Sequence, residues 1–376
     1  MVKPITQTRM SKTLPLHEVH QAASATFTDL FGWQVVQRFS SVEAEYWALH
    51  KTAGWIDLSC SGIFEVKGDD RTRFLHGMLT NDIKSLAPGC GCYAASLSPQ
   101  GRLVGDLRVF CCEESLLLTT EPAVREKLGP ALRKYIIGDR PVLLDRSEEL
   151  AILSLQGPRA TALLAKVFPE VASLEKPYSH QAADLAGARV RICHVCRTGW
   201  GGYDFIVERP MLRLVWNLIL QDGKQEGAEP VGFEGLNVHR VEAGIPWYGL
   251  DMDESTLPIE AGLEKSAISF NKGCYVGQES VARITYRGHV NRKLVGLRLS
   301  GSRPASQGNK IWRDSQEVGW VTSSVHSWRL GAAIALAYLR REVLDAAAPV
   351  SIDAGEGSID ARVVPLPFLD IPPATA

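Results

Sequence analysis

The sequence predicts an α+β protein in two parts, a mixed core over residues 1–286 and an antiparallel β-barrel over residues 287–376. Up to about residue 286, segments in which apolar residues recur at helical spacing alternate with short strand-like segments. After Lys293 only short strand-like segments follow, separated by glycine, proline, serine and aspartate. This second pattern is typical of a small antiparallel barrel. A chain of 376 residues is long enough for two or three domains with a sizeable core.

Start and stop signals predict the helices of the core. Ser40 and Glu43 form a capping-box pattern before apolar residues at helical spacing, and Gly54 ends that run. Pro158 suits the first position of a helix that reaches Phe168. The helices expected from such signals cover residues 17–30, 42–53, 70–79, 121–137, 158–168, 211–221, 234–243 and 278–285.

Turn signals predict the strands. The tetrapeptide Ser98-Pro99-Gln100-Gly101 separates two alternating segments and predicts a β-hairpin. The strands expected in the core cover residues 55–58, 63–66, 93–97, 103–111, 115–120, 142–145, 151–155, 188–197 and 203–207. Those expected in the barrel cover residues 293–299, 310–313, 317–325, 332–338 and 360–365, after a linker near residues 287–289.

The bulk composition is that of an ordinary globular protein. The formal net charge of -1 argues against nucleic acid or an anionic membrane as the main partner. No apolar run is long enough to span a bilayer, and residues 1–6 lack the hydrophobic centre of a secretion signal. We therefore expect a cytoplasmic protein with no membrane partner.

The chain contains eight cysteines, which we expect to be reduced thiols rather than a disulfide framework. Cys193 and Cys196 have the spacing of a metal-binding pair. They lie in a strand-like segment, however, where residues three apart point to opposite faces. No metal site is therefore expected at this pair.

Residues 271–280 hold one thiol, a lysine, two glycines, an amide and a carboxylate within ten positions. Gly273 and Gly277 suit a sharp turn or the close approach of another group. Cys274 comes just before the helix expected from residue 278, and the positive end of that helix together with Lys272 should favour a thiolate. The alternative is a glycine-bounded loop around a small buried cysteine.

This stretch, Lys-Gly-Cys-Tyr-x-Gly-Gln-Glu, resembles the signature of the YgfZ family, folate-binding proteins of iron–sulfur cluster assembly and repair. That family is related to the glycine cleavage T-protein, an aminomethyltransferase. The resemblance covers most of the chain and is strongest over residues 235–285. It implies a tetrahydrofolate-binding core of two intertwined α/β halves around a central channel, followed by the C-terminal barrel.

Asp106 lies within a mainly apolar strand, where a carboxylate needs a partner, a polar cavity or an exposed edge. From the residues alone, a solvent-facing aspartate is an equal alternative. The segment resembles the T-protein pattern Gly-x-x-x-Asp-Asp-Leu, with Gly105 in place of the first aspartate. The resemblance implies that Asp106 is the acid of catalysis at the folate and that Tyr93, on the partner strand, lines the folate site.

Residues 197–205 resemble the T-protein stretch Arg-Thr-Gly-Tyr-Thr-Gly-x-x-Gly-Phe-Glu, shortened by three residues. The family glutamate pairs with the pterin, because a carboxylate can accept two hydrogen bonds from its 2-amino group and ring N–H. The resemblance gives that role to Asp204 and puts Trp200 in the place of an aromatic tyrosine. The alternative for Trp200 is a core residue.

The longest match, over residues 235–263, resembles the block Gly-Leu-x-x-x-Arg-x-Glu-Ala-Gly…Tyr-Gly-x-Asp…Pro-x-Glu-Ala-Gly-Leu of the whole superfamily. Arg240 and Glu242 are two apart on a helix and do not face each other, so Arg240 is free to bind another group. The resemblance implies that Arg240 lines the folate cavity and that Tyr248 is a cavity aromatic. A buried structural ion pair is the alternative for Arg240.

Three functional hypotheses follow. The first is a tetrahydrofolate-binding protein of the YgfZ type with Cys274, Asp106 and Lys272 as catalytic residues. Its partners would be reduced folate and iron–sulfur enzymes or assembly proteins. The second is an aminomethyltransferase, in which a folate nitrogen takes up the methylene group of an aminomethyl-lipoyl carrier as ammonia leaves. The third is a one-carbon demethylase or a separate domain of a larger folate oxidoreductase, although no flavin motif supports an oxidoreductase.

Overall fold

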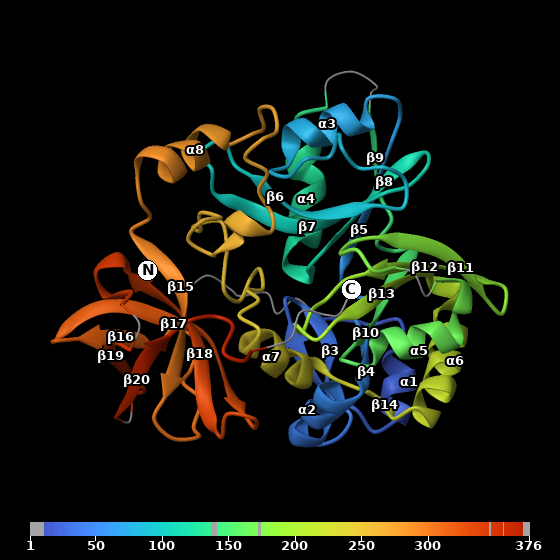
Figure 1. Ribbon diagram of the computed structural model, residues 1–376. Coiled ribbons are helices and arrows are strands. Elements are labelled where there is room, and N and C mark those ends of the chain that lie inside the picture. The colour runs from blue at the N-terminus through green and yellow to red at the C-terminus, as the bar shows by residue number, and fades with distance from the viewer. Residues whose placement is uncertain (1–10, 137–140, 172–173, 346, 356, 371–376) are drawn as a thin grey trace, which may run out of the picture.

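The computed structural model describes residues 11–136, 141–171, 174–345, 347–355 and 357–370. The core contains a six-stranded, a five-stranded and a three-stranded sheet, and the C-terminal part is a closed barrel beside them (Figure 1). The predicted fold class, an α+β core of two intertwined halves followed by an antiparallel barrel, is confirmed.

Two sheets form most of the core. The six-stranded sheet has the order β11 (His180–Leu185), β12 (Ala188–His194), β13 (Gly202–Glu208), β10 (Leu150–Gln156), β4 (Ala53–Asp57) and β14 (Ala228–Pro230). The five-stranded sheet has the order β6 (Gly91–Leu97), β7 (Leu103–Cys111), β8 (Ser115–Thr120), β5 (Gly62–Lys67) and β9 (Val142–Asp145). The halves are intertwined because β4 and β5 follow each other in the chain but belong to different sheets.

Helices cover these sheets and join them to the barrel. The helices of the core are α1 (His17–Ala22), α2 (Val42–Lys51), α3 (Arg71–Met78), α4 (Pro122–Arg133), α5 (Ala160–Val167), α6 (Leu212–Gln225), α7 (Phe233–Glu242) and α8 (Gln278–Arg287). Apolar residues of α5 and α6 pack on the six-stranded sheet, and those of α3 and α4 pack on the five-stranded sheet. This burial of apolar faces is what stabilises each half.

The helix predicted over residues 17–30 is wrong in its second half. Helix α1 ends at Ala22, and the chain continues as β2 (Thr26–Leu30), which forms a hairpin with β3 (Trp33–Arg38). Phe31 and Gly32 form the turn, with φ of 54° and 80°. Two successive positive φ values suit a tight hairpin turn, so the break at this dipeptide marks a strand reversal. Strand β1 (Lys12–Thr13) completes this three-stranded sheet.

The barrel closes through six antiparallel strands. In spatial order they are β15 (Arg292–Leu299), β18 (Ala332–Arg340), β17 (Gln316–Ser327), β16 (Lys310–Arg313), β19 (Pro349–Asp353) and β20 (Ser358–Val364). Strand β20 pairs again with β15, which leaves no free edge. The sequence analysis missed β19 in the barrel and β11 in the core, both of which are short strands between glycine- or proline-containing segments.

A buried carboxylate marks the junction between core and barrel. Glu242, at the end of α7, accepts hydrogen bonds from Tyr46 Oη (3.0 Å) on α2 and from Ser327 Oγ (2.5 Å) at the end of β17. Burial raises the pKa of Glu242 to about 7, although the hydrogen bonds from Ser327 and Tyr46 act in the opposite direction. The junction therefore contains a group that titrates near neutral pH.

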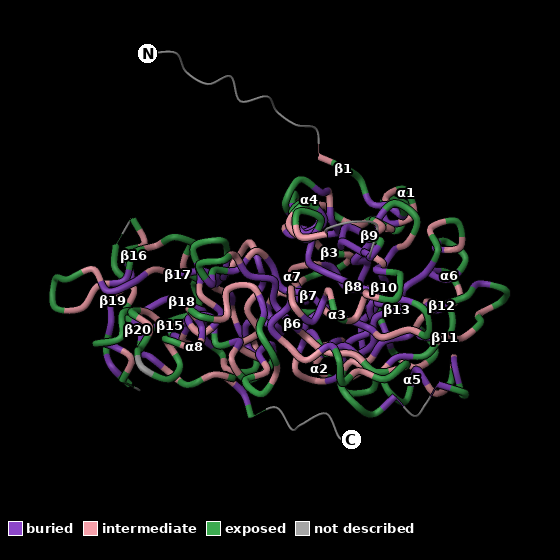
Figure 2. Tube along the Cα trace, turned by 90° about the horizontal axis from the view of Figure 1, so that it is seen from above, coloured by how far each residue is buried: buried purple, intermediate pink, exposed green. Residues whose placement is uncertain are grey.

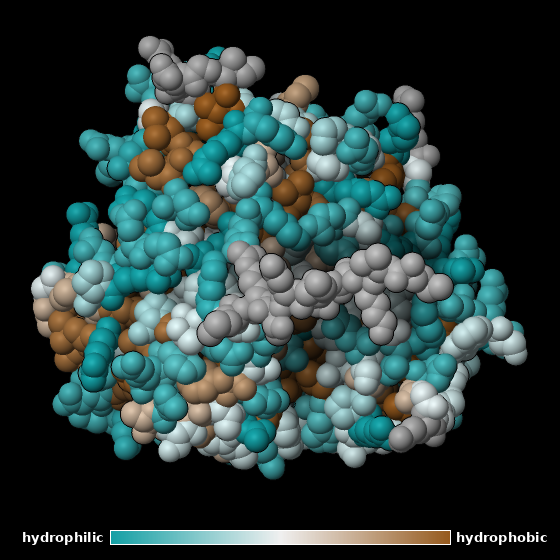
Figure 3. All heavy atoms as spheres, turned by 180° about the vertical axis from the view of Figure 1, so that it is seen from behind, coloured by the Kyte–Doolittle hydropathy of each residue, from teal (hydrophilic) through white to brown (hydrophobic). Residues whose placement is uncertain are grey.

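The ends of the described chain lie on opposite sides of the molecule. Strand β1 and the segment that follows β20 project from opposite sides in the view from above (Figure 2). From behind, hydrophobic residues form separate small groups among hydrophilic ones (Figure 3). Among the described helices, none combines the length and the apolar character needed to cross a membrane.

Candidate functional site

A cavity of about 620 Å³ lies where the two halves of the core meet the barrel. Its walls come from β6, β7, the start of α4, residues 244–247 and 261–266, β15 and the chain after β20. We call it the central cavity. Its charged and aromatic lining residues include Tyr93, Asp106, Arg108, Glu121, Tyr178 and Arg197, which come from β6, β7, the start of α4 and the segments before β11 and after β12.

Tyr93 and Asp106 meet in the central cavity. The β6–β7 register pairs Ala95 with Asp106, so Tyr93 lies diagonally opposite Asp106 on the same face. Tyr93 Oη donates a hydrogen bond of 2.7 Å to Asp106 Oδ2. The second carboxylate oxygen of Asp106, Oδ1, has no hydrogen-bond partner among the described residues, although Asp106 is only 3% exposed. A buried carboxylate oxygen without a donor among these residues is open to a donor from a ligand or a water molecule.

The surroundings of Asp106 bring its titration close to neutral pH. Burial raises the pKa of Asp106 to about 6, and the negative charge of Glu121 adds to this effect. Arg108 and the hydrogen bond from Tyr93 act in the opposite direction. Burial, together with the charge of Asp106, raises the pKa of Tyr93 well above its ordinary value, so Tyr93 stays a neutral donor. This arrangement suits proton transfer by Asp106.

Four charged side chains form a buried row beside Asp106. Glu121 Oε1 accepts hydrogen bonds of 2.9 Å from Arg108 Nη1 and from Arg197 Nη1. Arg197 also donates to both carboxylate oxygens of Asp204. Burial alone would raise the pKa of Glu121, but Arg197 and Arg108 outweigh burial and lower it. Glu121 is therefore a permanently charged carboxylate in the central cavity.

Sequence reasoning did not identify Glu121, Arg108, Tyr178 and Cys196, which are among the residues that line the central cavity. The ring of Tyr178 is nearly parallel to that of Tyr93, with 6.4 Å between centroids and 16° between planes. The sequence did contain a signal for Glu121, because its position before Pro122 places it at the start of a predicted helix. No local pattern marks Tyr178, which comes from the segment before β11.

Asp204 and Trp200 are not among the residues that line the central cavity. Asp204 is buried, and Ser154 Oγ donates to its Oδ1 at 2.7 Å in addition to the bonds from Arg197. Trp200 packs edge-on against His50, with 4.8 Å between ring centroids, and Arg329 lies 5.7 Å from the Trp200 ring. A direct contact of either residue with a pterin stays a prediction.

Arg240 lines the central cavity and also joins the core to the barrel. Its Nη1 donates to Asp251 Oδ2 at 2.5 Å, and its Nη2 donates to Ser323 Oγ in β17 at 2.7 Å. Asp251 Oδ1 in turn accepts from Thr322 (2.6 Å) and Ser323 (2.7 Å). The guanidinium thus takes part in the buried ion pair named as the alternative, while folate contact by Arg240 stays a prediction.

Tyr248 lines a second cavity of about 400 Å³ rather than the central one. Consecutive residues line the two cavities. Trp247 and Glu121 line the central cavity, and the residues that follow them, Tyr248 and Pro122, line the second. Lys12 of β1 also lines the second cavity, and β1 lies on the side opposite the chain after β20, which lines the central cavity (Figure 2). The two cavities therefore have lining residues on opposite sides of the core.

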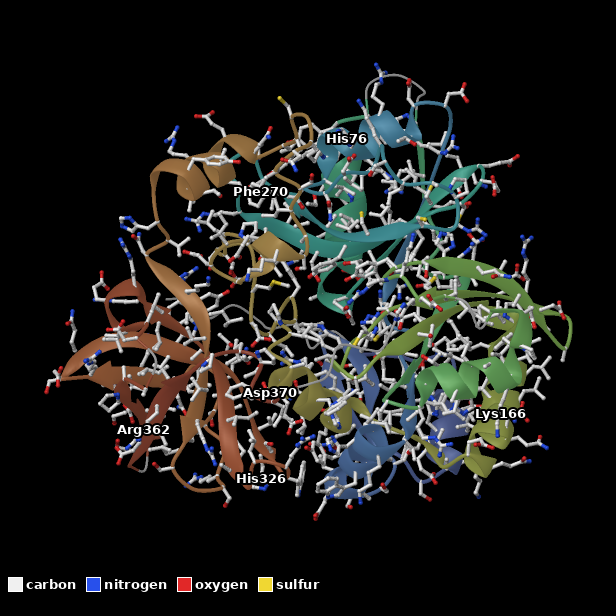
Figure 4. The ribbon with its side chains drawn as sticks, viewed as in Figure 1. His76, Lys166, Phe270, His326, Arg362 and Asp370 are labelled. Atoms are coloured by element: carbon white, nitrogen blue, oxygen red, sulfur yellow. The ribbon has the colours of Figure 1, made fainter. Side chains whose placement is uncertain are left out.

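Lys272 closes the end of α3. Its ammonium group donates hydrogen bonds to the backbone carbonyls of His76, Leu79 (2.6 Å) and Asn81 (3.0 Å). Carbonyls at the end of a helix lack intrahelical donors, so this contact is structural. Burial lowers the pKa of Lys272 to about 8. Phe270 and His76 lie at the same end of the molecule, away from the barrel (Figure 4).

Cys274 is exposed and is not among the residues that line the central cavity. Its neighbour Tyr275 is buried in the core of the five-stranded half. Gly277 has φ of 83°, and a Cβ there would lie 2.5 Å from the carbonyl oxygen of Ser98 in the β6–β7 turn. The glycine-rich stretch therefore has a structural reason, and a catalytic role for Cys274 stays a prediction.

Comparison with known proteins identifies the family. Residues 16–272 match the GCVT N-terminal domain, and residues 292–370 match the glycine cleavage T-protein C-terminal barrel domain. An aminomethyltransferase of Geobacillus sp. is 32% identical over 96% of this chain and 99% of its own length. One of Chloroherpeton thalassium is 31% identical over 95% of this chain and 99% of its own length.

The fold is also that of a solved aminomethyltransferase. The crystal structure of the glycine cleavage system aminomethyltransferase T from Bartonella henselae is similar, with a TM-score of 0.87 and 24% identity. The similarity covers 96% of this chain and 98% of that one. These comparisons favour the second hypothesis from the sequence and do not confirm a YgfZ assignment. The chain belongs to the glycine cleavage T-protein family.

Proposed function

We propose that the protein transfers an aminomethyl-derived one-carbon unit to tetrahydrofolate. The observation that carries this proposal is Asp106, a buried carboxylate with one oxygen held by Tyr93 and the other without a partner among the described residues. Relatives named aminomethyltransferase, similar over nearly their whole length, support the same activity.

The central cavity fits a reduced folate. Its volume of about 620 Å³ lies within the usual range of roughly 300–1,000 Å³ for small-molecule sites. One end holds the aromatic rings of Tyr93 and Tyr178 and the unpartnered oxygens of Asp106 and Glu121. Aromatic faces suit a flat pterin ring, and the carboxylates suit its N–H groups.

The proposed reaction needs no oxidant. An aminomethyl thioether of a lipoyl carrier and tetrahydrofolate give ammonia, the free thiol and 5,10-methylenetetrahydrofolate. The carbon loses its bonds to nitrogen and sulfur and gains bonds to N5 and N10, while the two protons from those nitrogens go to ammonia and the thiol.

Asp106 is the proposed base for one of these protons. A carboxyl group with a pKa of about 6 is mostly ionised at neutral pH but still binds a proton readily. Tyr93 holds Oδ2 and leaves Oδ1 to receive the proton. The charge of Glu121 keeps Asp106 basic enough for this role.

The second cavity offers the carrier a separate approach. Tyr248 and Pro122, which line it, directly follow Trp247 and Glu121 of the central cavity. A folate entering from the side of the chain after β20 would leave the side of β1 free for the lipoyl arm. We propose that the two substrates meet near Asp106 from these two sides.

The test combines the purified protein, reduced folate and an aminomethylated lipoyl carrier protein, with ammonia and methylenetetrahydrofolate as readouts. Asp106→Asn should slow transfer by about 10²- to 10⁴-fold, the usual range for loss of a general base, and should weaken folate binding less than tenfold. The matched control is Glu149→Gln, because the Glu149 side chain is 61% exposed and pairs with Arg146 at the surface. Absence of ammonia release above the carrier-only rate would refute the proposal.

A second candidate function is the YgfZ-type role in assembly or repair of iron–sulfur enzymes. The observation in its favour is that Cys274 is exposed on a stretch held in place by Lys272 and Gly277. Under this function, Cys274→Ala should abolish complementation of a strain that lacks its own YgfZ protein. Full rescue by Cys274→Ala would remove the thiol from the proposal.

A further inference from the structure

We infer that Glu121, rather than Asp204, is the carboxylate that binds the donor edge of the reduced pterin, formed by its 2-amino group and the adjacent ring N–H. This inference rests on the proposed folate-dependent function and deepens it, because it names the residue that orients the ring.

One carboxylate oxygen of Glu121 is available to a ligand. The residue is only 3% exposed and lines the central cavity. Its Oε1 is saturated by the two arginine donors, Arg108 and Arg197, while Oε2 has no hydrogen-bond partner among the described residues. A buried ionised oxygen needs a donor, and a pterin edge carries two N–H groups side by side.

Both carboxylate oxygens of Asp204 already accept hydrogen bonds from the protein. Its Oδ1 accepts from Ser154 and from Arg197 Nε, and its Oδ2 accepts from Arg197 Nη2 at 2.7 Å. Asp204 is also absent from the lining of the central cavity. Because Arg197 donates to both Asp204 and Glu121, Asp204 is a positioning residue that fixes the arginine.

Close packing of α4 on β7 brings Glu121 to the central cavity. Val124, in the first turn of α4, packs on β7 at Gly105, where an added Cβ would lie 2.3 Å from Val124 Cγ1. Only glycine allows this close approach. The residue that replaces the first aspartate of the family pattern thus lets the helix start, with Glu121, lie beside the strand that carries Asp106.

The pKa values of the two carboxylates, Glu121 and Asp106, are shifted in opposite directions. Arg197 and Arg108 keep Glu121 charged, whereas burial raises the pKa of Asp106 to about 6. A permanent anion suits recognition of N–H donors, and a carboxylate that titrates near neutral pH suits proton transfer. The structure therefore separates ring recognition from chemistry.

The experiment removes the ligand's 2-amino group and the Glu121 charge in turn. Calorimetry compares 5-formyltetrahydrofolate with its 2-desamino-2-methyl analogue on the full-length protein. Wild type should bind the analogue about 10- to 100-fold more weakly, as expected for loss of a charge-assisted hydrogen bond. Glu121→Gln should bind the two ligands within threefold of each other, because its amide presents a donor where the carboxylate accepted.

Matched variants locate the interaction. Asp204→Asn and Asp106→Asn should each keep the tenfold or larger preference for the amino-bearing ligand. If Glu121→Gln does not fold, as judged by circular dichroism and melting, Glu121→Asp is used instead. A preference reduced to between threefold and tenfold in that variant supports the inference, and an undiminished preference overturns it.

Three other results would overturn the inference. A wild-type preference below threefold shows that no carboxylate reads the 2-amino group. Loss of the preference in Asp204→Asn or Asp106→Asn, with Glu121→Gln unaffected, assigns the role to another residue. Failure of wild type to bind any reduced folate refutes the proposed function itself and, with it, this inference.

Discussion

Removing the Tyr93 hydroxyl should shift the pH at which the protein becomes active. Tyr93→Phe deletes the 2.7 Å hydrogen bond to Asp106 Oδ2 and keeps the aromatic ring. That bond favours the ionised form of Asp106, so its loss should raise the pKa of Asp106 further above its ordinary range. Because the ionised carboxylate is the proposed base, the acidic limb of the rate profile should move to higher pH.

The size of this shift follows from the energy of one hydrogen bond to a charged group. Such a bond contributes about 1.5–3 kcal/mol, and 1.36 kcal/mol corresponds to one pKa unit, so the expected rise is about one to two units; the rates below are worked for the smaller rise, about one unit. With the wild-type pKa at about 6, transfer by Tyr93→Phe should be about fivefold slower at pH 6. It should be about twofold slower at pH 7 and nearly equal to wild type above pH 8.

The assay is kcat for aminomethyl transfer between pH 5 and 9. Tyr178→Phe is the matched control, because it removes a hydroxyl from the same cavity but no hydrogen bond to Asp106. Its acidic limb should stay where the wild-type limb is. An unchanged limb in Tyr93→Phe, or a limb moved to lower pH, would refute the role given to this hydrogen bond.

Three further predictions concern stability, measured by urea unfolding. Glu242 titrates at about 7 when folded and at 4.5 when unfolded, so its contribution is fully present below pH 4.5 and is lost as pH rises through 7. Glu242→Gln lacks this titration. The difference in unfolding free energy between Glu242→Gln and wild type should therefore change by about 3 kcal/mol in favour of the variant as the pH rises from 4.5 to 8, and an equal difference at both pH values would contradict this. Lys272→Met leaves three carbonyls without their donor and should cost about 2–3 kcal/mol, whereas a loss under 1 kcal/mol would show that water replaces the ammonium. Asp251→Asn leaves the Arg240 guanidinium buried without its counter-charge and should cost about 3–5 kcal/mol, and wild-type stability of this variant would show that the pair contributes nothing.

Local patterns predicted what lies on one hairpin. Tyr93 and Asp106 lie on neighbouring strands joined by the turn at residues 98–101, so their meeting follows from alternation along the strands and a single short turn. Five of the six barrel strands could also be predicted, because glycine, proline, serine or aspartate residues separate them. The strand β19 was missed although the four-residue strand β16 was predicted, because β19 begins with Pro349 and ends with Asp353, two residue types depleted in strands.

Contacts between segments that are far apart in the sequence could not be predicted. Glu121 and Arg197 are 76 positions apart, and no residue pattern says that the start of α4 faces the segment between β12 and β13. Asp204 matches the family glutamate by position, but its oxygens are taken by Arg197, seven residues earlier. Lys272 binds backbone carbonyls, which every residue has, so no residue type in the sequence could indicate this contact.

The central cavity has walls from both parts of the chain, with Asp106 on the core side and residues 293–295 and 363–366 on the barrel side. A molecule held there touches both parts at once and acts as a bridge across their interface. Occupancy should therefore raise the melting temperature of the joined protein, in proportion to the logarithm of ligand concentration once the site is saturated. A fragment that ends before β15 would lose one wall of the cavity and therefore also the stabilisation by a ligand that contacts both parts.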